Sequence, residues 1–298
     1  MTQHISDTLI SKVFSSADYN PTHDAMLKRS LERIALKKDQ GLRTPDELWI
    51  VDHNDVYTLG QAGKEEHILQ RTDTPIIKTD RGGQVTWHGH GQLVIYWLFD
   101  LHSLGWSVRN LVSHAEQAIE DVVNDCVASQ TSKSTKMAIS NRINPTTNAI
   151  TTISAHARRD APGVYLYADN SLSDNAYDNA NNLNNTDSLD DDATSNAPAD
   201  DAIMLGKIAS LGFKIKHGFS YHGIALNLNC DLSAFNAINP CGYAGMQMLR
   251  LADFVAMQDP TDEQMRVALS YEQVTQKLID NIAQRHAGSI TLRPIASK

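Results

Sequence analysis

An uninterrupted apolar run, Leu93 to Leu98, limits the possible folds more than any other part of the sequence. A run of this kind, without polar alternation, is typical of a strand that is buried on both faces of its sheet. Directly before it lies a segment, Arg81 to Gln92, that holds four glycines, one arginine and two histidines. Glycine weakens a strand, so glycines next to a strand indicate that another group approaches the backbone closely. We therefore expect a buried strand at residues 93–98, preceded by a glycine-rich segment whose backbone is approached closely by another part of the protein or by a ligand.

The rest of the chain predicts strands followed by separated helices, which is typical of an α+β fold. Apolar residues at helical spacing predict helices over residues 23–38, 107–128 and 261–287. Further strands are expected at 48–51, 56–59, 75–78, 84–88, 153–157 and 163–167. Residues 53–55 are expected to join the first two of these as a hairpin, and residues 207–229 to form an antiparallel pair turned near His217 and Gly218. Residues 1–298 are expected to form one domain.

Charge is unevenly distributed along the chain. The formal net charge is −9, but nine aspartates and no lysine, arginine or glutamate fall between Ala168 and Asp201. The remainder is close to neutral, so no basic excess favours binding to nucleic acid. This acidic stretch, at about 168–201, and a Ser/Thr/Asn-rich stretch at about 129–152 are too poor in large apolar residues to offset the entropy lost on ordering. We expect both to be flexible insertions.

Cysteine content and apolar runs bear on the location of the protein. Three cysteines among 298 residues do not form a disulfide framework, which favours a reducing cytoplasm. No apolar run is long enough to cross a membrane, and residues 1–7 lack the basic start and apolar core of a secretion signal. Cys126, near the end of a predicted helix, and Cys230, after an alternating strand, are expected to be core residues.

Cys241 has a different setting from the other two cysteines. It lies in the segment Asn239 to Tyr243, in which Pro240 fixes its own φ and Gly242 permits a positive φ. The chain is therefore expected to bend around the cysteine and to present its sulfur. A cysteine that packs as a small hydrophobe usually has apolar neighbours, which this one lacks. Cys241 is a candidate reactive thiol, although the local pattern alone also permits a structural role.

Three segments together carry a resemblance to a known family: residues 81–92, residues 207–227 and residues 239–243. The second runs from Lys207-Ile208-Ala209-Ser210-Leu211-Gly212 to His222-Gly223-Ile224-Ala225-Leu226-Asn227. In this order and at these separations, the segments resemble those of the lipoyl(octanoyl) transferases of lipoate biosynthesis. The resemblance extends from about Leu48 to Ile282. Two residues depart from the family pattern, since His90 stands where proline is usual and Trp87 where tyrosine is common.

The resemblance implies the catalytic-domain fold of biotin and lipoate ligases, that is, a central mixed β-sheet flanked by helices. It also implies transfer of an octanoyl group from octanoyl-acyl carrier protein to a lysine of lipoyl-domain proteins. Cys241 would be the nucleophile, and Lys207 the neighbouring cation and proton acceptor. The implied acceptors are the E2 subunits of 2-oxoacid dehydrogenases and the H protein of glycine cleavage. The implied acyl pocket comprises Arg81, Gly82, Gly83, Gln84, Val85, Thr86, Trp87, His88, Ser210, Leu211, Gly212, Gly223, Ile224 and Ala225.

Several alternatives remain open from the sequence. An ATP-dependent lipoate or biotin ligase could use the same scaffold, and a non-catalytic protein could bind lipoyl domains with the same sheet. His88 and His90, with His222 and Cys241, could imitate a zinc site, but the glycines around His90 suit backbone access better than the fixing of ligands. Without the family motif, Lys207 would be interpreted as a solvated surface lysine. We expect no metal and no nucleotide cofactor, because a thioester donor is already activated.

Overall fold

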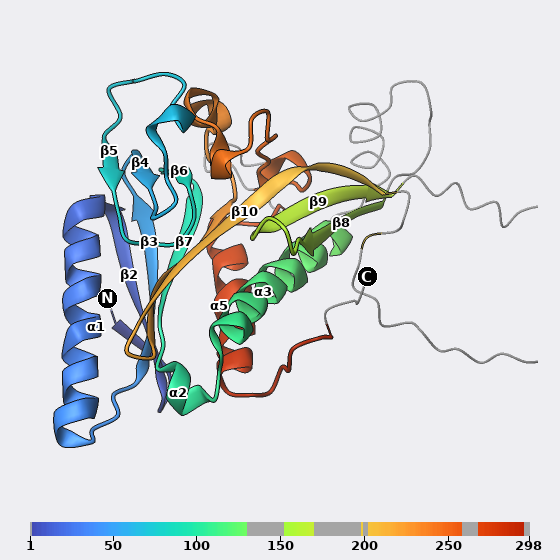
Figure 1. The fold of residues 1–298 in the computed structure, drawn as a ribbon. Helices are drawn as coiled ribbons and strands as arrows, with labels where there is room; N and C mark the ends of the chain where they lie inside the picture. Colours follow the sequence, from blue (N-terminus) through green and yellow to red (C-terminus); the bar gives the residue numbers. More distant parts are fainter. Residues whose placement is uncertain (1, 130–151, 170–197, 199–201, 258–267, 295–298) are drawn as a thin grey trace, which may run out of the picture.

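The main feature of the fold is an eight-stranded sheet (Figure 1), seen in a computed structural model that describes residues 2–129, 152–169, 198, 202–257 and 268–294. In spatial order the strands are β1 (Thr2–Ser6), β2 (Leu9–Ala17), β3 (Asp46–His53), β7 (Gln92–Leu98), β11 (Phe219–Asn227), β10 (Ile203–Lys216), β9 (Val164–Asp169) and β8 (Thr152–Ala157). Strands β2 and β3 pair in parallel, while the other neighbours pair antiparallel. The sheet is therefore mixed, and the α+β prediction is confirmed.

Strand β7 is the buried strand that the apolar run predicted. Every residue of it is buried, and it pairs with β3 on one side and β11 on the other. Ile95, for example, lies opposite Ile50 of β3 and Ile224 of β11. Strand β7 follows the glycine-rich segment in the chain and pairs with β11 along one edge. It therefore places β11 beside that segment.

Helices cover both faces of the large sheet (Figure 1). Helices α3 (Val108–Ser129) and α5 (Tyr271–His286) pack together on one face, where they enclose the largest apolar core. Helix α1 (Tyr19–Gln40) lies on the opposite face and places Met26 against Trp49 and Tyr96. A short helix, α2 (Leu101–Leu104), follows β7. The predicted flanking helices are confirmed, and α1 begins four residues before the predicted boundary at residue 23.

A second, smaller sheet has the order β5 (Ile76–Lys78), β4 (Val56–Leu59), β6 (Val85–His88). The predicted hairpin between residues 48–51 and 56–59 is wrong, because β3 belongs to the large sheet and β4 to the small one. Both edges of β3 are already taken by β2 and β7, so the chain crosses at residues 53–55 from one sheet to the other. This crossing places the small sheet next to the start of β7, because the glycine-rich segment at residues 81–92 contains β6 and leads directly into β7.

Two further differences concern the ends of the chain. The first two strands were not predicted, since β1 is mostly exposed and β2 alternates only in its first half. The predicted helix over 261–287 is present from Tyr271, where Ser270 and Gln273 form a capping box, and residues 261–267 lie outside the described residues. The insertions expected at about 129–152 and 168–201 also fall almost entirely outside the described residues.

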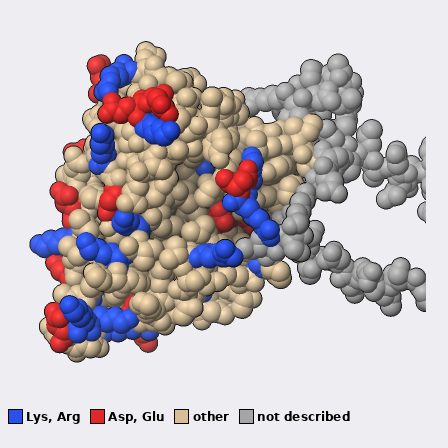
Figure 2. All heavy atoms as spheres, viewed as in Figure 1, with Lys and Arg blue, Asp and Glu red and all other residues tan. Residues whose placement is uncertain are grey.

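The turn between β10 and β11 lies where it was predicted. His217 and Gly218 connect the two strands with positive φ angles of 48° and 80°. None of the helices among the described residues is both long and apolar enough to span a membrane. On the face shown in Figure 2, basic and acidic side chains are interspersed, and neither sign covers a large continuous area.

Candidate active site

A cavity of about 420 Å³ opens between the large sheet, the small sheet and the loop that carries Cys241. It brings together residues from all three segments that carried the family resemblance. The predicted residues on its wall are Arg81, Gly82, Gly83, Gln84, Val85, Thr86, His88, Lys207, Ser210, Leu211, Gly212, Gly223, Ile224, Ala225 and Cys241. The wall also includes residues that were not predicted, among them Tyr19, Val94, Tyr96, Ala161, Pro162 and Tyr243.

Lys207 and Cys241 meet at this cavity. The Nζ atom of Lys207 lies 3.0 Å from the Sγ atom of Cys241 and donates a second hydrogen bond to the carbonyl oxygen of Pro162 at 2.8 Å. The same Nζ atom lies over the ring of Tyr165, 5.3 Å from its centroid. Lys207 is only 1% exposed. The expectation of a solvated surface lysine, which the sequence without its motif would favour, is therefore wrong.

Backbone hydrogen bonds tie the loop of Cys241 to the strand of Lys207. The Lys207 N–H donates to the carbonyl oxygen of Gln247, and the Lys207 carbonyl accepts from the N–H of Leu249, both at 2.8 Å. Residues 247–249, a few positions after the thiol, thus pair with β10 at the position of the lysine. The two side chains meet because the chain returns to β10 directly after Cys241.

Cys241 lies at a sharp bend, as its neighbours predicted. It is half-buried and adopts φ 56° and ψ 17°, and Gly242 follows with φ 79°. A non-glycine residue in this region costs on the order of 1–3 kcal/mol, which the surrounding structure has to offset. The other two cysteines are buried, and burial raises the pKa of Cys126 to about 11 and that of Cys230 to about 12. Of the three thiols, only that of Cys241 combines access to the cavity with an adjacent ammonium.

Arg81 organises the glycine-rich part of the wall. Its guanidinium donates to the carbonyl oxygens of Gly82 and Gln84, and to both oxygens of Thr58 on β4. All of these acceptors are uncharged. Burial lowers the pKa of Arg81, yet a guanidinium starts so high that it stays charged near neutral pH. The backbone carbonyl groups of Gly82 and Gln84 in this loop therefore point towards the buried guanidinium of Arg81.

His88 and Trp87 point in opposite directions, as successive residues of a strand do. His88 lines the cavity, and its Nδ1 lies 2.7 Å from Oε1 of Gln92. Burial, together with the nearby His53 and Arg81, lowers the pKa of His88 to about 3, so this side chain is neutral at pH 7. Trp87 does not line the cavity; it is buried in a separate core and makes an edge-on contact with Phe235 at 5.6 Å. The expectation that Trp87 belongs to the pocket wall does not agree with this position.

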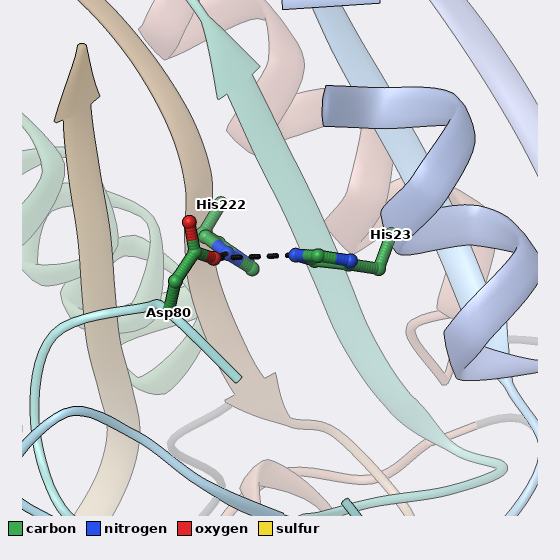
Figure 3. A group of neighbouring side chains, drawn as sticks. All are labelled: His23, Asp80 and His222. Atoms are coloured by element: carbon green, nitrogen blue, oxygen red, sulfur yellow. Dashed lines mark hydrogen bonds and ion pairs between the residues drawn. The ribbon is translucent and has the colours of Figure 1, made fainter. Parts of the chain in front are cut away.

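One group of side chains near the cavity, His23, Asp80 and His222, could hold a metal ion (Figure 3). They come from α1, the loop after β5 and β11, and their ligand atoms lie within 4.8 Å of one another. Nε2 of His222 lies 2.9 Å, and Nε2 of His23 3.2 Å, from Oδ1 of Asp80. Tyr221 donates to the other carboxylate oxygen. These hydrogen bonds, first of all that from His222, hold the pKa of Asp80 far below its ordinary value.

The same group is well explained as a hydrogen-bond network. Both carboxylate oxygens of Asp80 already accept hydrogen bonds, and the charged Arg81 follows directly in the chain. The Nδ1 atom of His222 has no hydrogen-bond partner among the described residues, whereas a metal-bound histidine usually donates from its second nitrogen. The network therefore fixes Asp80, and with it Arg81, at the wall of the cavity. Sequence reasoning did not single out His23 or Asp80, because no local pattern links residues so far apart.

The structure does not bring His90 together with His88, His222 and Cys241, so the zinc site considered from the sequence is not formed. His90 is exposed, and its Nδ1 lies 3.0 Å from both carboxylate oxygens of Asp52, away from the cavity wall. Gly91, with φ 81°, lies against the backbone of Cys230, so its role is the close backbone approach that was expected of these glycines.

Comparison with known proteins places the chain in a family. The model of the lipoyl protein ligase A/B catalytic domain matches residues 24–282. An octanoyltransferase of Psychrobacter arcticus is 67% identical over all of this chain and 97% of the relative, and one of Psychrobacter cryohalolentis is 64% identical over the same shares. The octanoyltransferase of Acinetobacter baylyi is 38% identical over 84% of this chain and 86% of its own length.

The solved structures that resemble the chain are more distant in sequence. A lipoate-protein ligase A bound with ATP is 12% identical and has a TM-score of 0.40, with 93% of this chain and 86% of that chain covered. A biotin protein ligase from Aquifex aeolicus is 10% identical, with a TM-score of 0.31 over 94% and 70% of the two chains. The sequence matches span nearly the whole chain, including all three segments that meet at the cavity, and they assign the chain to the octanoyltransferases, acyltransferases of lipoate biosynthesis in the lipoyl protein ligase A/B catalytic-domain family.

Proposed function

We propose that this chain transfers an octanoyl group from octanoyl-acyl carrier protein to a lysine of a lipoyl-domain protein through a thioester on Cys241. The observation that carries the proposal is the 3.0 Å contact between Lys207 Nζ and Cys241 Sγ at the wall of a cavity. A free thiol near its reference pKa of about 8.5 is only a few per cent ionised at pH 7. An ammonium in contact with the sulfur favours the thiolate, which is the nucleophilic form.

In the first half of the reaction, the thiolate of Cys241 attacks the carbonyl carbon of the donor thioester. The tetrahedral intermediate collapses with cleavage of the bond to the carrier sulfur, which leaves an octanoyl thioester on Cys241. Lys207 gives its proton to the departing carrier thiolate, so the carrier leaves as a thiol and the lysine becomes neutral. The neutral amine remains beside the acylated sulfur, held by the carbonyl oxygen of Pro162.

In the second half, the neutral ε-amine of the acceptor lysine attacks the thioester carbonyl. Lys207 accepts the proton that the attacking nitrogen loses, and the bond to Sγ of Cys241 breaks. The products are an octanoyl amide and the original pair of thiolate and ammonium. The proton that Lys207 gives to the carrier thiol is thus replaced by the proton from the acceptor amine, and the donor thioester supplies the driving force without a nucleotide.

The cavity suits a straight alkyl chain. Its wall on β10 and β11 includes small residues such as Gly212, Gly223 and Ala225, and Val94 adds apolar surface. At about 0.8 kcal/mol for each buried methylene, roughly six methylenes would contribute ~5 kcal/mol before entropic costs. This contribution is large enough to discriminate between chain lengths. The acceptors in this proposal are lipoyl-domain proteins such as the E2 subunits of 2-oxoacid dehydrogenases and the H protein of glycine cleavage.

Intact-mass analysis tests the proposal. The protein is mixed with octanoyl-acyl carrier protein in the absence of ATP, and we expect a covalent gain of one octanoyl group that maps to Cys241. Addition of a lipoyl domain is expected to remove this group from the enzyme and to place it on the acceptor lysine. An acceptor that is modified only when ATP and free octanoate are supplied would favour the ligase alternative. Tight association without any covalent adduct would favour a binding protein.

The position of Gly163 leads to a prediction about the catalytic lysine. A Cβ atom at this residue would lie 2.4 Å from Cε and 2.7 Å from Nζ of Lys207, and its φ of 140° disfavours a side chain. We expect Gly163→Ala to displace the ammonium and to reduce octanoyl transfer by roughly 100-fold, as a displacement near 1 Å at a reacting group does. Initial rates with octanoyl-acyl carrier protein and a lipoyl domain measure the effect.

Gly105→Ala is the matched control for this variant. Gly105 also has a positive φ, 68°, but a Cβ atom added there would have no other atom within 4 Å. We expect it to lose roughly 1 kcal/mol of stability and to retain its rate of transfer. Equal rates for the two variants would show that Gly163 does not set the position of Lys207.

The side chain of Ala225 offers a test of the acyl cavity. Ala225 pairs with Val94 across β11 and β7, and both residues belong to the cavity wall. We expect Ala225→Leu to shorten the space for the alkyl chain by about two methylenes, and so to lower the rate with octanoyl relative to hexanoyl donor by about ten-fold. Because both donors are compared on one variant, a general loss of folded protein cancels. An unchanged ratio would place the alkyl chain elsewhere.

A further inference from the structure

A continuous series of hydrogen bonds runs from helix α3 to the thiol of Cys241. Oε1 of Glu116, on α3, accepts from the N–H of Gly163 at 3.2 Å. The neighbouring carbonyl oxygen, that of Pro162, accepts from Lys207 Nζ at 2.8 Å, and the same Nζ contacts Sγ of Cys241 at 3.0 Å. We propose that Glu116 is a positioning residue, which fixes the turn at Pro162 and Gly163 and thereby holds the amine of Lys207 against Cys241. This inference rests on the proposed function, in which Lys207 activates the thiol.

The hydrogen bonding of Glu116 is directed to the turn at Pro162 and Gly163. Among the described residues, its side chain makes the one hydrogen bond to Gly163. Glu120, one helical turn later, instead pairs with Arg293 at 2.8 Å and accepts from the N–H of Ala157 at 2.5 Å. A carboxyl group that is removed from water costs free energy unless it is hydrogen-bonded or paired. The hydrogen bond from Gly163 offsets part of the cost of placing the Glu116 carboxyl group in this half-buried position.

The charges around Glu116 agree with this geometry. Burial, and to a smaller extent the nearby Glu120, raises the pKa of its carboxyl group to about 7. The hydrogen bond from Gly163 and the positive charge of Lys207 act on this pKa in the opposite direction. The carboxylate thus lies close enough to Lys207 to interact with its charge, although the turn stands between the two groups.

The turn can transmit position because it is packed directly against the lysine. Gly163 approaches Lys207 so closely that even one added carbon atom would overlap its Cε and Nζ. A lysine side chain has four flexible bonds and a compact ammonium, so it needs a fixed acceptor to stay in one place. Pro162 supplies that acceptor, and Glu116 ties the backbone next to it to a helix of the main core. Loss of the carboxyl group would therefore loosen the ammonium, while Cys241 itself stays in its bend.

Alkylation of Cys241 by iodoacetamide tests this inference without any octanoyl substrate. The rate is followed at pH 7 and pH 9.5 by intact mass and peptide mapping. In Glu116→Ala we expect about ten-fold slower alkylation than in the wild type at pH 7, because the ammonium no longer stays next to the sulfur. At pH 9.5 we expect equal rates, since a thiol is largely ionised there with or without a neighbour. Glu116→Gln keeps a hydrogen-bond acceptor of the same reach and is expected to stay within about two-fold of the wild type at both pH values.

Two further variants make the result decisive. Glu120→Ala removes a carboxyl group from the same helix that also accepts a backbone N–H, and we expect it to leave alkylation unchanged. If Glu116→Ala does not fold, Glu116→Asp replaces it, since the shorter side chain keeps the charge but not the reach, and slow alkylation at pH 7 is again expected. Wild-type rates at pH 7 in Glu116→Ala or Glu116→Asp would overturn the inference. So would equal slowing in Glu116→Gln, or the same slowing in Glu120→Ala.

The alkylation experiment can fail or succeed independently of the test for the octanoyl-enzyme. If no octanoyl group ever appears on Cys241 but the alkylation pattern is as expected, the positioning role stands and the acyl-enzyme proposal fails. If octanoyl-Cys241 forms and Glu116→Ala alkylates like the wild type, the acyl-enzyme stands and the role of Glu116 is overturned.

Discussion

Cys241→Ala is expected to abolish octanoyl transfer, with a loss on the order of 10⁴-fold or more, because the acyl group would have no nucleophile to carry it between donor and acceptor. The variant is also expected to show no octanoyl adduct in intact-mass analysis. The fold should be retained, since Cys241 is half-buried in a loop and alanine removes only the sulfur. The measurement is the initial rate with octanoyl-acyl carrier protein and a lipoyl domain, beside a thermal unfolding curve.

Cys126→Ala is the matched control for that result. Cys126 lies within α3, fully buried and remote from the cavity wall. We expect this variant to lose some stability from the core and to transfer octanoyl groups at close to the wild-type rate. Transfer that persists in Cys241→Ala would exclude the acyl-enzyme mechanism, and a requirement for ATP in that variant would support the ligase alternative.

Lys207→Arg is expected to keep a positive charge next to Cys241 and still to lose about 10²- to 10⁴-fold in turnover, the usual contribution of general acid–base catalysis. A guanidinium does not give up its proton near neutral pH, so it cannot accept one from the attacking amine. The loss should therefore be uneven between the two half-reactions. Formation of octanoyl-Cys241 is expected to be slowed less than its transfer to the lipoyl domain, because a carrier thiolate can leave without a proton. Single-turnover experiments on each half-reaction measure this difference.

Lys214→Arg provides the comparison on the same strand. Lys214 lies on β10 at a position outside the cavity wall, so the exchange is expected to leave both half-reactions unchanged. If Lys207→Arg slows both half-reactions equally, its role is electrostatic and the proton acceptor is another group. If it turns over normally, Lys207 is not part of the chemistry.

The sequence predicted well those strands, helices and turns that depend only on residues close to them in the chain. The continuous apolar run at residues 93–98 has no amphipathic alternation, and it is the central strand β7. The bend at Cys241 follows from a proline and a glycine on either side, and the β10–β11 turn from His217 and Gly218. Helix α3 was recognised from one apolar face that packs in the main core. In each case the information lies within a few residues of the feature.

The features that were missed depend on pairing between distant parts of the chain. Residues 48–51 and 56–59 have the pattern of a hairpin, but β2 and β7 occupy both edges of β3, and no local pattern reports that competition. The position of Trp87 depends on which face of β6 meets the cavity, which the family pattern did not specify. The contact between His23 and Asp80 joins residues 57 positions apart. The pairing of Lys207 with Cys241 was expected from the family motifs alone, because the local pattern favoured a surface position for Lys207 and left the role of Cys241 open.

The return of residues 247–249 to β10 has a consequence for how the enzyme tolerates change. The backbone of Lys207 pairs with residues 247–249, a few positions after Cys241, whereas the rest of the cavity wall comes from both sheets and from helices α1 and α3. Substitutions on the parts of the wall other than the turn at Pro162 and Gly163 are expected to change the size of the cavity while Lys207 and Cys241 keep their contact. Selectivity for the acyl group can therefore diverge among such enzymes while the chemistry stays intact.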